Sequence, residues 1–181
     1  IICFNKTDET DVQEMRRLSD IYSDSGCHVM FTSTVTGDGM NELREMLHGH
    51  TTALAGPSGV GKSSILNALV EQAYMETGSI SEKIGRGRHT TRHSEVFVLD
   101  DESYILDTPG FTSLSVMVDD RDRLRLYMPE FDSYEGKCRF SGCVHINEPD
   151  CAVKAAVNSG KINAARYESY VAMYNELNKR R

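Results

Sequence analysis

The sequence predicts an α/β fold, with a mostly parallel sheet flanked by helices, followed by a small, mainly α-helical subdomain. Two observations support this prediction. Short apolar runs alternate with helical patterns over the first part of the 181 residues, as in βα units. Farther along, the pattern changes to a charged helix, a cluster of cysteines and a histidine, and a final helix. We therefore expect one domain over 1–118 and a subdomain over 119–181.

The individual elements follow from hydrophobic periodicity. Short apolar runs predict buried strands at 1–4, 29–31, 53–55, 96–99 and 104–106. Helical spacing predicts helices at 11–22, 40–47, 62–70 and 119–128, and a last helix carrying Tyr167, Val171, Tyr174 and Leu177. The stretch 77–93 is rich in Gly, Ser, Arg and His without an apolar period, which predicts a surface loop.

Composition limits the class of protein. The net charge of −7 argues against a general nucleic-acid coat, because affinity for phosphate backbones requires dense Lys and Arg. No apolar run approaches the roughly 20 residues that cross a bilayer, and the start has no signal-peptide layout. We expect a cytoplasmic monomer with no membrane or DNA partner, in which any RNA contact is local.

The sequence GPSGVGKS at 56–63 is a complete phosphate-binding loop between an apolar strand and a helix. In such a loop backbone N–H groups surround the phosphates, Lys62 places its charge on the β and γ oxygens, and Ser63 binds Mg²⁺. The alternative, a glycine-rich turn that matches by chance, is disfavoured by the flanking strand and helix. The expected phosphate contacts are Gly56, Ser58, Gly59, Val60, Gly61, Lys62, Ser63 and Ser64.

A second motif, NKTD, begins at Asn5 and predicts that the base is guanine. The Asp8 carboxylate would accept hydrogen bonds from guanine N1–H and its 2-amino group, whereas adenine N1 is itself an acceptor. Asn5 and the stem of Lys6 would brace this loop. Ser33 and Thr34 follow the next strand, where a backbone N–H can meet guanine O6. Alone NKTD could be a surface turn; together with the phosphate-binding loop it predicts a GTP/GDP site.

The order of these two motifs is reversed. In the usual guanine-nucleotide switch protein the phosphate-binding loop comes first and NKxD follows, whereas here NKTD comes first. This order predicts a circularly permuted P-loop GTPase fold.

A third motif, DTPG, follows the strand at 104–106 and has the form DxxG. Asp107 would reach Mg²⁺ through water, and the Gly110 N–H would meet the γ-phosphate. A plain type I turn with proline in second place is the alternative. Many GTPases carry a water-orienting Gln at the next position. Phe111 can neither donate nor accept a hydrogen bond, so we expect slow intrinsic hydrolysis.

Another group must then orient the water. His89 in GRGRHTTR is the candidate, and Thr90 or Thr91 is expected to complete Mg²⁺ coordination with Ser63, with Thr91 assigned as the ligand. A solvated loop histidine is the alternative. Lys62, His89, Thr90 and Thr91 are therefore the expected catalytic residues. The same segment has basic residues that predict either an RNA contact or a solvated loop: Lys83, Arg86, Arg88, Arg92 and His93.

The cluster Cys138-x4-Cys143-x-His145-x5-Cys151 offers three thiolates and one imidazole. This closed tetrahedral set predicts one structural Zn²⁺ with no position left for water. The ion would stabilise a subdomain that lacks a core of its own. A chance cluster of reduced cysteines and an iron–sulfur centre are the alternatives.

Taken together, NKTD, TST, GPSGVGKSS, RGRHTT, DTPGF and the Cys/His cluster, in this order, resemble the RsgA (YjeQ) family of small-subunit-dependent GTPases. The resemblance spans nearly the whole chain. It implies GTP hydrolysis stimulated by the ribosome, a role in late maturation of the small (30S) subunit, and that subunit and its rRNA as partners. It also implies a preceding OB-fold and one further strand, so we expect the chain to begin inside its GTPase domain.

Two other functions stay open at this point. One is a GTP-gated RNA- or ribosome-binding module with little turnover. The other is a different circularly permuted GTPase or a P-loop ATPase, which the Cys/His cluster and Asp8 respectively disfavour.

Overall fold

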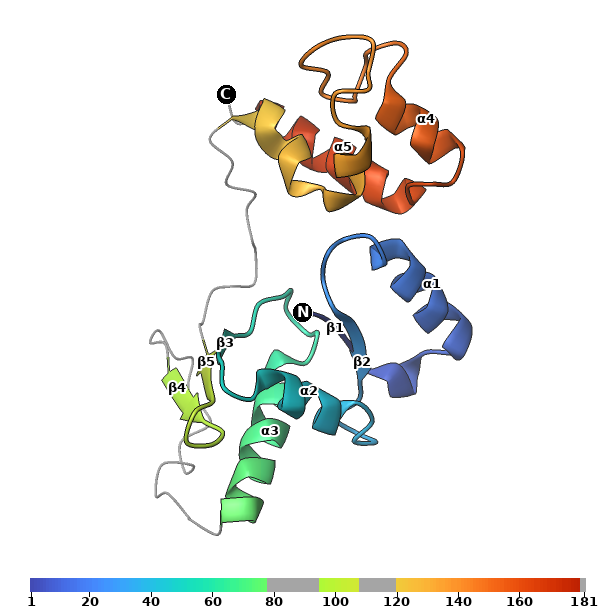
Figure 1. Cartoon of the computed structure of the whole chain (residues 1–181). Coiled ribbons are helices and arrows are strands. Elements are labelled where there is room, and N and C mark those ends of the chain that lie inside the picture. Colours follow the sequence, from blue (N-terminus) through green and yellow to red (C-terminus); the bar gives the residue numbers. More distant parts are fainter. Residues whose placement is uncertain (78–94, 108–119, 180–181) are drawn as a thin grey trace. The chain divides into compact units, whose positions relative to one another are not determined.

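The computed structural model describes residues 1–77, 95–107 and 120–179 (Figure 1). Gly110, the predicted boundary near residue 118 and nearly all of the predicted loop, with His89, Thr90 and Thr91, lie outside the described residues. Contacts within the chain group it into two units. We call residues 3–11 and 30–114 the sheet unit, and residues 1–2, 12–29 and 115–181 the C-terminal unit. Every helix in the described ranges is too short or too polar to cross a membrane.

The sheet unit alternates strands and helices, as predicted. Its strands are β1 (Ile2–Asn5), β2 (Val29–Thr32), β3 (Thr51–Ala53), β4 (Glu95–Val98) and β5 (Tyr104–Asp107). The first residues of β1 and β2 are grouped with the C-terminal unit. Its helices are α2 (Met40–Leu47), α3 (Lys62–Thr77) and the short 3-10 turn η1 (Thr7–Glu9).

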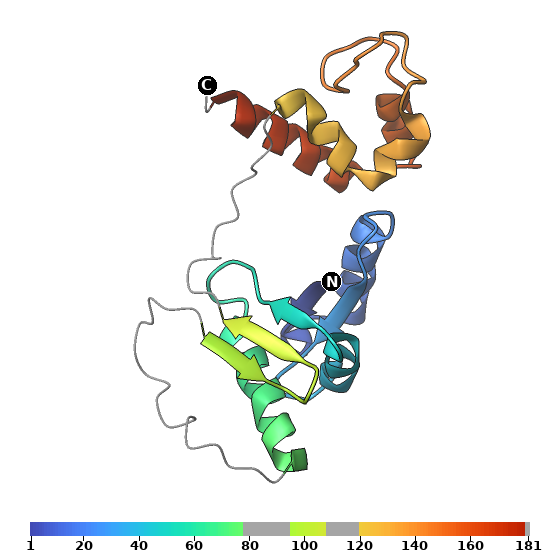
Figure 2. The ribbon, with the colours of Figure 1, turned by 60° about the vertical axis from the view of Figure 1, so that its left-hand side comes forward.

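Strand β5 lies in the middle of a three-stranded sheet (Figure 2). It pairs with β3 in parallel, with Thr52 opposite Ile105, and with β4 antiparallel, with Phe97 opposite Ile105. Strands β1 and β2 form a second, two-stranded sheet. Because β3 and β5 run in the same direction, the sequence GPSGVGKS leaves the sheet at the edge where β5 ends with Asp107.

Apolar faces of α2 and α3 form the core of the sheet unit together with the fully buried Ile105. Helix α3 extends seven residues past the predicted end at Val70, because Ala73 lies one turn beyond Leu69 and continues the buried face. Strand β3 begins and ends two residues earlier than predicted, although Leu54 still packs against the core.

Apart from the first residues of β1 and β2, the regular elements described in the C-terminal unit are helices. It contains α1 (Val12–Tyr22), η3 (Arg121–Tyr127), η4 (Pro129–Tyr134), α4 (Ala152–Asn158) and α5 (Ala164–Lys179). The helix predicted at 119–128 is the 3-10 helix η3. The Asp120 side chain caps its start by accepting from the Asp122 N–H, and Pro129 follows its end.

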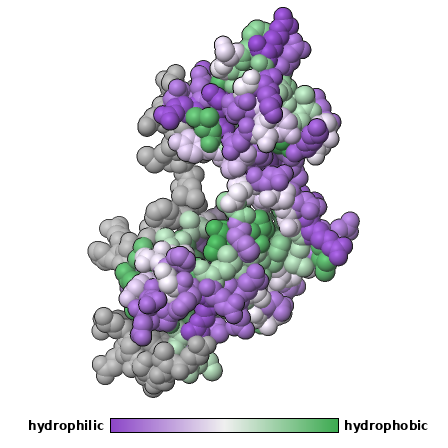
Figure 3. Space-filling model, viewed as in Figure 1, coloured by the Kyte–Doolittle hydropathy of each residue, from purple (hydrophilic) through white to green (hydrophobic). Residues whose placement is uncertain are grey.

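The prediction that the C-terminal subdomain lacks a core of its own is wrong. Phe131, Val153, Ile162 and Tyr170 are buried in one cluster, which also includes the ligand candidates Cys143 and Cys151. The spacing in α5 indicated residues that only pack against this cluster: Tyr167, Val171, Tyr174 and Leu177. Apart from Tyr170, the buried members come from η3, η4, α4 and the segments between helices, where the sequence shows no clear apolar period. On the face seen in Figure 3, hydrophilic residues cover most of the surface of residues 120–179.

Candidate nucleotide site and metal centre

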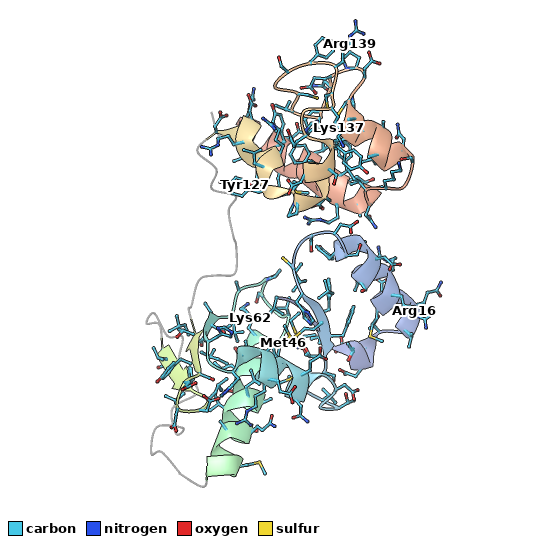
Figure 4. All side chains as sticks on the ribbon, in the orientation of Figure 1. Arg16, Met46, Lys62, Tyr127, Lys137 and Arg139 are labelled. Atoms are coloured by element: carbon cyan, nitrogen blue, oxygen red, sulfur yellow. The ribbon has the colours of Figure 1, made fainter. Side chains whose placement is uncertain are left out.

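The phosphate-binding loop connects β3 to α3, and Lys62 is the first residue of the helix (Figure 4). The Lys62 Nζ donates hydrogen bonds to the carbonyl oxygens of Gly56 (2.7 Å) and Pro57 (2.8 Å). These two bonds hold the ammonium group against its own loop. Ser63 and Ser64 are exposed in the first turn of α3, and Ser58 is exposed in the loop before it. Backbone N–H groups in the first turn of a helix have no partner within the helix, so they can bind an anion.

Asn5 joins the two motifs that lie far apart in the sequence. Its Nδ2 donates to the Val60 carbonyl oxygen at 3.0 Å, and its Oδ1 accepts from the Thr32 hydroxyl at 3.2 Å. Thr32 is fully buried at the end of β2, so both ends of the Asn5 amide are fixed by partners in the fold. The structure therefore brings the NKTD loop into direct contact with the phosphate-binding loop.

The Asp8 carboxylate is held by Ser33. The fully buried Ser33 hydroxyl donates a short hydrogen bond to Asp8 Oδ1 and accepts from the backbone N–H groups of Val35 and Thr36, both at 3.2 Å. Asp8 itself is exposed, so a base can reach its carboxylate. Thr34, the next residue, is half-buried. From the sequence we predicted only a backbone contact with the base at Ser33 and Thr34. The hydrogen bonds of the Thr32 and Ser33 hydroxyl groups were not predicted.

Two further predicted positions lie next to these loops. Lys6 has the left-handed conformation (φ 72°) and its exposed ammonium group pairs with Glu9 at 3.5 Å. Asp107 is half-buried and is the last residue of β5, at the same sheet edge as the phosphate-binding loop. Gly110 and the predicted catalytic residues of the 78–94 segment lie outside the described residues.

Replacing Gly61 by alanine should destabilise the nucleotide-free protein more than replacing Gly59. Both glycines have positive φ (96° and 83°), so both substitutions strain the backbone by about 1–2 kcal/mol. A Cβ at Gly61 would lie 2.2 Å from Asn5 Nδ2, whereas one at Gly59 meets nothing within 4 Å. Displacing Asn5 also breaks its two hydrogen bonds, about 1 kcal/mol each.

Thermal unfolding without nucleotide measures this difference. We expect Gly61→Ala to unfold several degrees below Gly59→Ala, and to bind GDP at least about 10-fold more weakly than the wild type. Equal midpoints for the two variants would show that Asn5 does not clamp the loop.

The four cysteine and histidine side chains of the C-terminal unit converge. One ligand atom from each of Cys138, Cys143, His145 and Cys151 lies within 4.8 Å of the other three. His145 Nδ1 is 3.3 Å from Cys151 Sγ and 3.6 Å from Cys138 Sγ, and these two sulfurs are 3.9 Å apart. Bond lengths to tetrahedral zinc give edges of about 3.8 Å between sulfurs and about 3.6 Å between nitrogen and sulfur. The residues present therefore fit such an ion.

Backbone N–H groups point at the three sulfurs. The N–H groups of His145, Ala152 and Lys154 lie 3.4, 3.3 and 3.5 Å from Sγ of Cys143, Cys138 and Cys151 respectively. These dipoles favour thiolates over thiols. Without a metal, burial raises the pKa of Cys143 to about 12, so binding of a metal must displace protons.

Tyrosines of α5 hold the loop that carries His145. The hydroxyl of Tyr167 donates to the His145 carbonyl oxygen at 2.7 Å, and that of Tyr170 donates to the Val144 carbonyl oxygen at 2.6 Å. The sequence pattern predicted Tyr167 only as an apolar contact of a helix. Helical spacing shows which face is buried, but not where a hydroxyl at its edge finds an acceptor.

Comparison with known families places residues 1–117 within the family model described as RsgA GTPase. The small ribosomal subunit biogenesis GTPase RsgA of Agathobacter rectalis is 54% identical over 179 residues, which cover 99% of this chain and 59% of that protein. The protein of the same name from Clostridium perfringens strain SM101 is 49% identical over 181 residues, which cover 100% of this chain and 63% of that protein. The chain thus spans about three fifths of these relatives.

Two solved structures are similar to the chain. YjeQ from Thermotoga maritima has a TM-score of 0.78 and 38% identity, over 99% of this chain and 60% of that one. YloQ, described as a circularly permuted GTPase, has a TM-score of 0.74 and 31% identity, over 100% of this chain and 57% of that one. These similarities confirm the fold class, including the permutation predicted from the order of the two loops.

Proposed function

Because the chain belongs to the RsgA GTPase family, we propose that it binds GTP and hydrolyses it to GDP and phosphate in the biogenesis of the small ribosomal subunit. The contacts that connect the two predicted nucleotide-binding loops are the main support for this proposal. Asn5 links the NKTD loop to Val60 of the phosphate-binding loop, and Ser33 holds the Asp8 carboxylate beside it. A nucleotide can therefore meet a base-reading carboxylate and a phosphate-binding loop in one site.

Each loop has a separate task in this proposal. Asp8 accepts from guanine N1–H and the 2-amino group, and Asn5 and Lys6 brace that loop, with Ser33 and Thr34 beside the base. The loop from Gly56 to Ser64 surrounds the phosphates. On nucleotide binding, Lys62 exchanges its two carbonyl partners for phosphate oxygens, a charge-assisted contact.

Hydrolysis needs groups from the other two motifs. Mg²⁺, when bound, neutralises charge that develops on the β- and γ-phosphate oxygens. Ser63 and Thr91 would hold it, with Thr90 as the other candidate, and Asp107 would reach it through water. The Gly110 N–H would contact the γ-phosphate, and His89 would orient the attacking water, since Phe111 cannot do so.

We further propose that the small subunit and its rRNA supply the stimulation that the isolated chain lacks. One zinc ion held by Cys138, Cys143, His145 and Cys151 has a structural role, because these four ligands leave no open position. A monomer in the cytoplasm, with no membrane or DNA partner, is consistent with the acidic composition.

GTP turnover with and without purified small ribosomal subunits tests the proposal. We expect slow turnover alone and a marked stimulation by the subunits. Lys62→Ala should lower the stimulated kcat/KM at least about 100-fold, because a charge on the transferring phosphate is lost. His89→Ala should lower stimulated kcat by about 100-fold or more with little change in KM for GTP.

The control is Asn67→Ala, at an exposed position of the same helix as Lys62. It should leave turnover unchanged. Negligible turnover in the presence of subunits would instead favour a GTP-gated binding module, and equal use of ATP would contradict the role of Asp8.

A further inference from the structure

His145 uses its two ring nitrogens on opposite sides. Its Nδ1 faces the sulfurs of Cys151 and Cys138, at 3.3 and 3.6 Å. Its Nε2 lies 3.1 Å from Oε1 of Glu135, a residue outside the Cys/His pattern. The imidazole is 1% exposed, so no water competes for either nitrogen. One nitrogen is therefore directed to the metal position and the other to a carboxylate.

Glu135 is itself held in place by Arg125. The Arg125 Nη1 donates a short hydrogen bond to Oε2 of Glu135, so the two carboxylate oxygens have different partners. The carboxylate is thus fixed between the imidazole of His145 and the guanidinium group of Arg125. The side chains of Arg125 and Glu135 are only 22% and 27% exposed, so solvent screens the contact weakly.

We propose that Arg125 and Glu135 form an outer layer of the metal site that fixes the tautomer of His145. A neutral imidazole carries its proton on either nitrogen, and only the form protonated on Nε2 presents a lone pair from Nδ1 to a metal. Glu135 accepts the Nε2–H and so selects that form. Arg125 keeps Glu135 aligned and balances its charge. Glu135 is thus a positioning residue that raises metal affinity without contacting the metal.

This layer also connects the metal loop to the helical part of the unit. Arg125 lies in η3 and Glu135 directly follows η4, and α5 packs against η3. Among the described residues, Arg125 Nε is buried without a hydrogen-bond partner. The acidic partner of the guanidinium group is Glu135, at Nη1. Arg125 and His145, each 10 positions from Glu135 in the sequence, are therefore joined through its carboxylate.

The proposal rests on the zinc ion proposed above, so the full chain is first purified with Zn²⁺ and its metal content is measured. Transfer of Zn²⁺ to a chelating dye then gives the affinity of each variant. We expect Glu135→Ala to lower affinity about 10–100-fold. Glu135→Gln keeps an acceptor for Nε2–H but turns an amide donor toward Arg125, so it should fall between Glu135→Ala and the wild type. Arg125→Met should also be intermediate.

A matched control separates alignment of the imidazole from stability of the loop. Glu148 accepts from the backbone N–H groups of Val144 (2.8 Å) and Ile146 (3.0 Å), but not from the His145 ring. Glu148→Gln should loosen the loop and lower the unfolding temperature. It should leave the tautomer unchanged.

Nitrogen-15 NMR of the His145 ring in the zinc-loaded protein reads the tautomer directly. The wild type and Glu148→Gln should show a protonated, slowly exchanging Nε2 and a metal-bound Nδ1. In Glu135→Ala the Nε2–H should exchange with solvent much faster. Absence of zinc from the wild-type chain would remove the proposed zinc ion itself. Zinc-loaded wild type with unchanged affinity and unchanged Nε2–H exchange in Glu135→Ala would overturn only the role of Glu135.

Discussion

Asp8→Asn should bind GDP about 10²–10⁴-fold more weakly than the wild type and should gain affinity for xanthosine diphosphate. In the proposed site the wild-type carboxylate accepts two hydrogen bonds from guanine, each about 1.5–3 kcal/mol because the acceptor is charged. Asparagine replaces one carboxylate oxygen with an NH₂ group, which faces the N1–H and 2-amino donors of guanine. Xanthine has a carbonyl in place of the 2-amino group and can accept from that NH₂.

Ser33 determines the orientation of the side-chain amide in Asp8→Asn. Its hydroxyl donates to Oδ1 of Asp8 and would donate in the same way to the amide oxygen of asparagine. The NH₂ group is then directed away from Ser33, toward the base. Ser33→Ala should for this reason reduce the discrimination between guanine and xanthine nucleotides in the Asp8→Asn background, because the amide can then rotate.

Fluorescent GDP and XDP analogues measure both affinities by titration. Glu9→Gln is the matched control, since it removes one negative charge from the same 3-10 turn and breaks only the exposed pair with Lys6. A surface pair contributes under about 1 kcal/mol, so GDP affinity should change less than about 5-fold. If Asp8→Asn bound GDP as well as Glu9→Gln does, Asp8 would not read the base.

The extent to which the sequence predicts this site depends on how local each contact is. The phosphate-binding loop and NKTD are local patterns, and their order predicted a permutation that the similar structures confirm. The link from Asn5 to Val60 spans 55 positions, and the hydroxyls of Thr32 and Ser33 act through directions set by the fold. Propensity and periodicity contain no information about those directions.

In the candidate metal centre, too, local patterns were predictable from the sequence and distant contacts were not. Spacing alone identified its four ligand candidates, because ligand types in a short segment have few other uses in a reduced protein. Glu135 and Arg125 could not be found this way, since carboxylates and guanidinium groups occur throughout the chain. The core of the C-terminal unit was missed because its 3-10 helices repeat every three residues and are too short to show a period.

Removing the proposed zinc ion from the purified chain should selectively destabilise the C-terminal unit. Three thiolates and one imidazole would lose their common partner, and Cys143 and Cys151 belong to the buried cluster with Phe131 and Tyr170. Structural zinc contributes up to about 10–16 kcal/mol in peptides that have no other core. Here the apolar cluster remains, so we expect a loosened unit rather than a fully unfolded one.

Calorimetry and hydrogen exchange would measure this effect after treatment with a chelator. A loss of even about 3 kcal/mol lowers the unfolding midpoint of a unit of this size by about 10–20 °C. Amide exchange should rise strongly in the loop from Gly136 to Asp150 and rise less in α5. The strands around Asn5 and Thr32 should exchange as before, because they belong to the sheet unit.

Cysteine variants separate loss of the metal from side effects of the chelator. Cys138→Ser removes a half-buried ligand and should reproduce the effect of the chelator, with little added cost from lost packing. Cys27→Ser makes the same chemical change at an exposed cysteine outside the cluster and should leave zinc content and midpoint unchanged. If Cys138→Ser unfolded at the same temperature as Cys27→Ser, the four side chains would not be joined by a structural metal, and the apolar cluster alone would hold the unit.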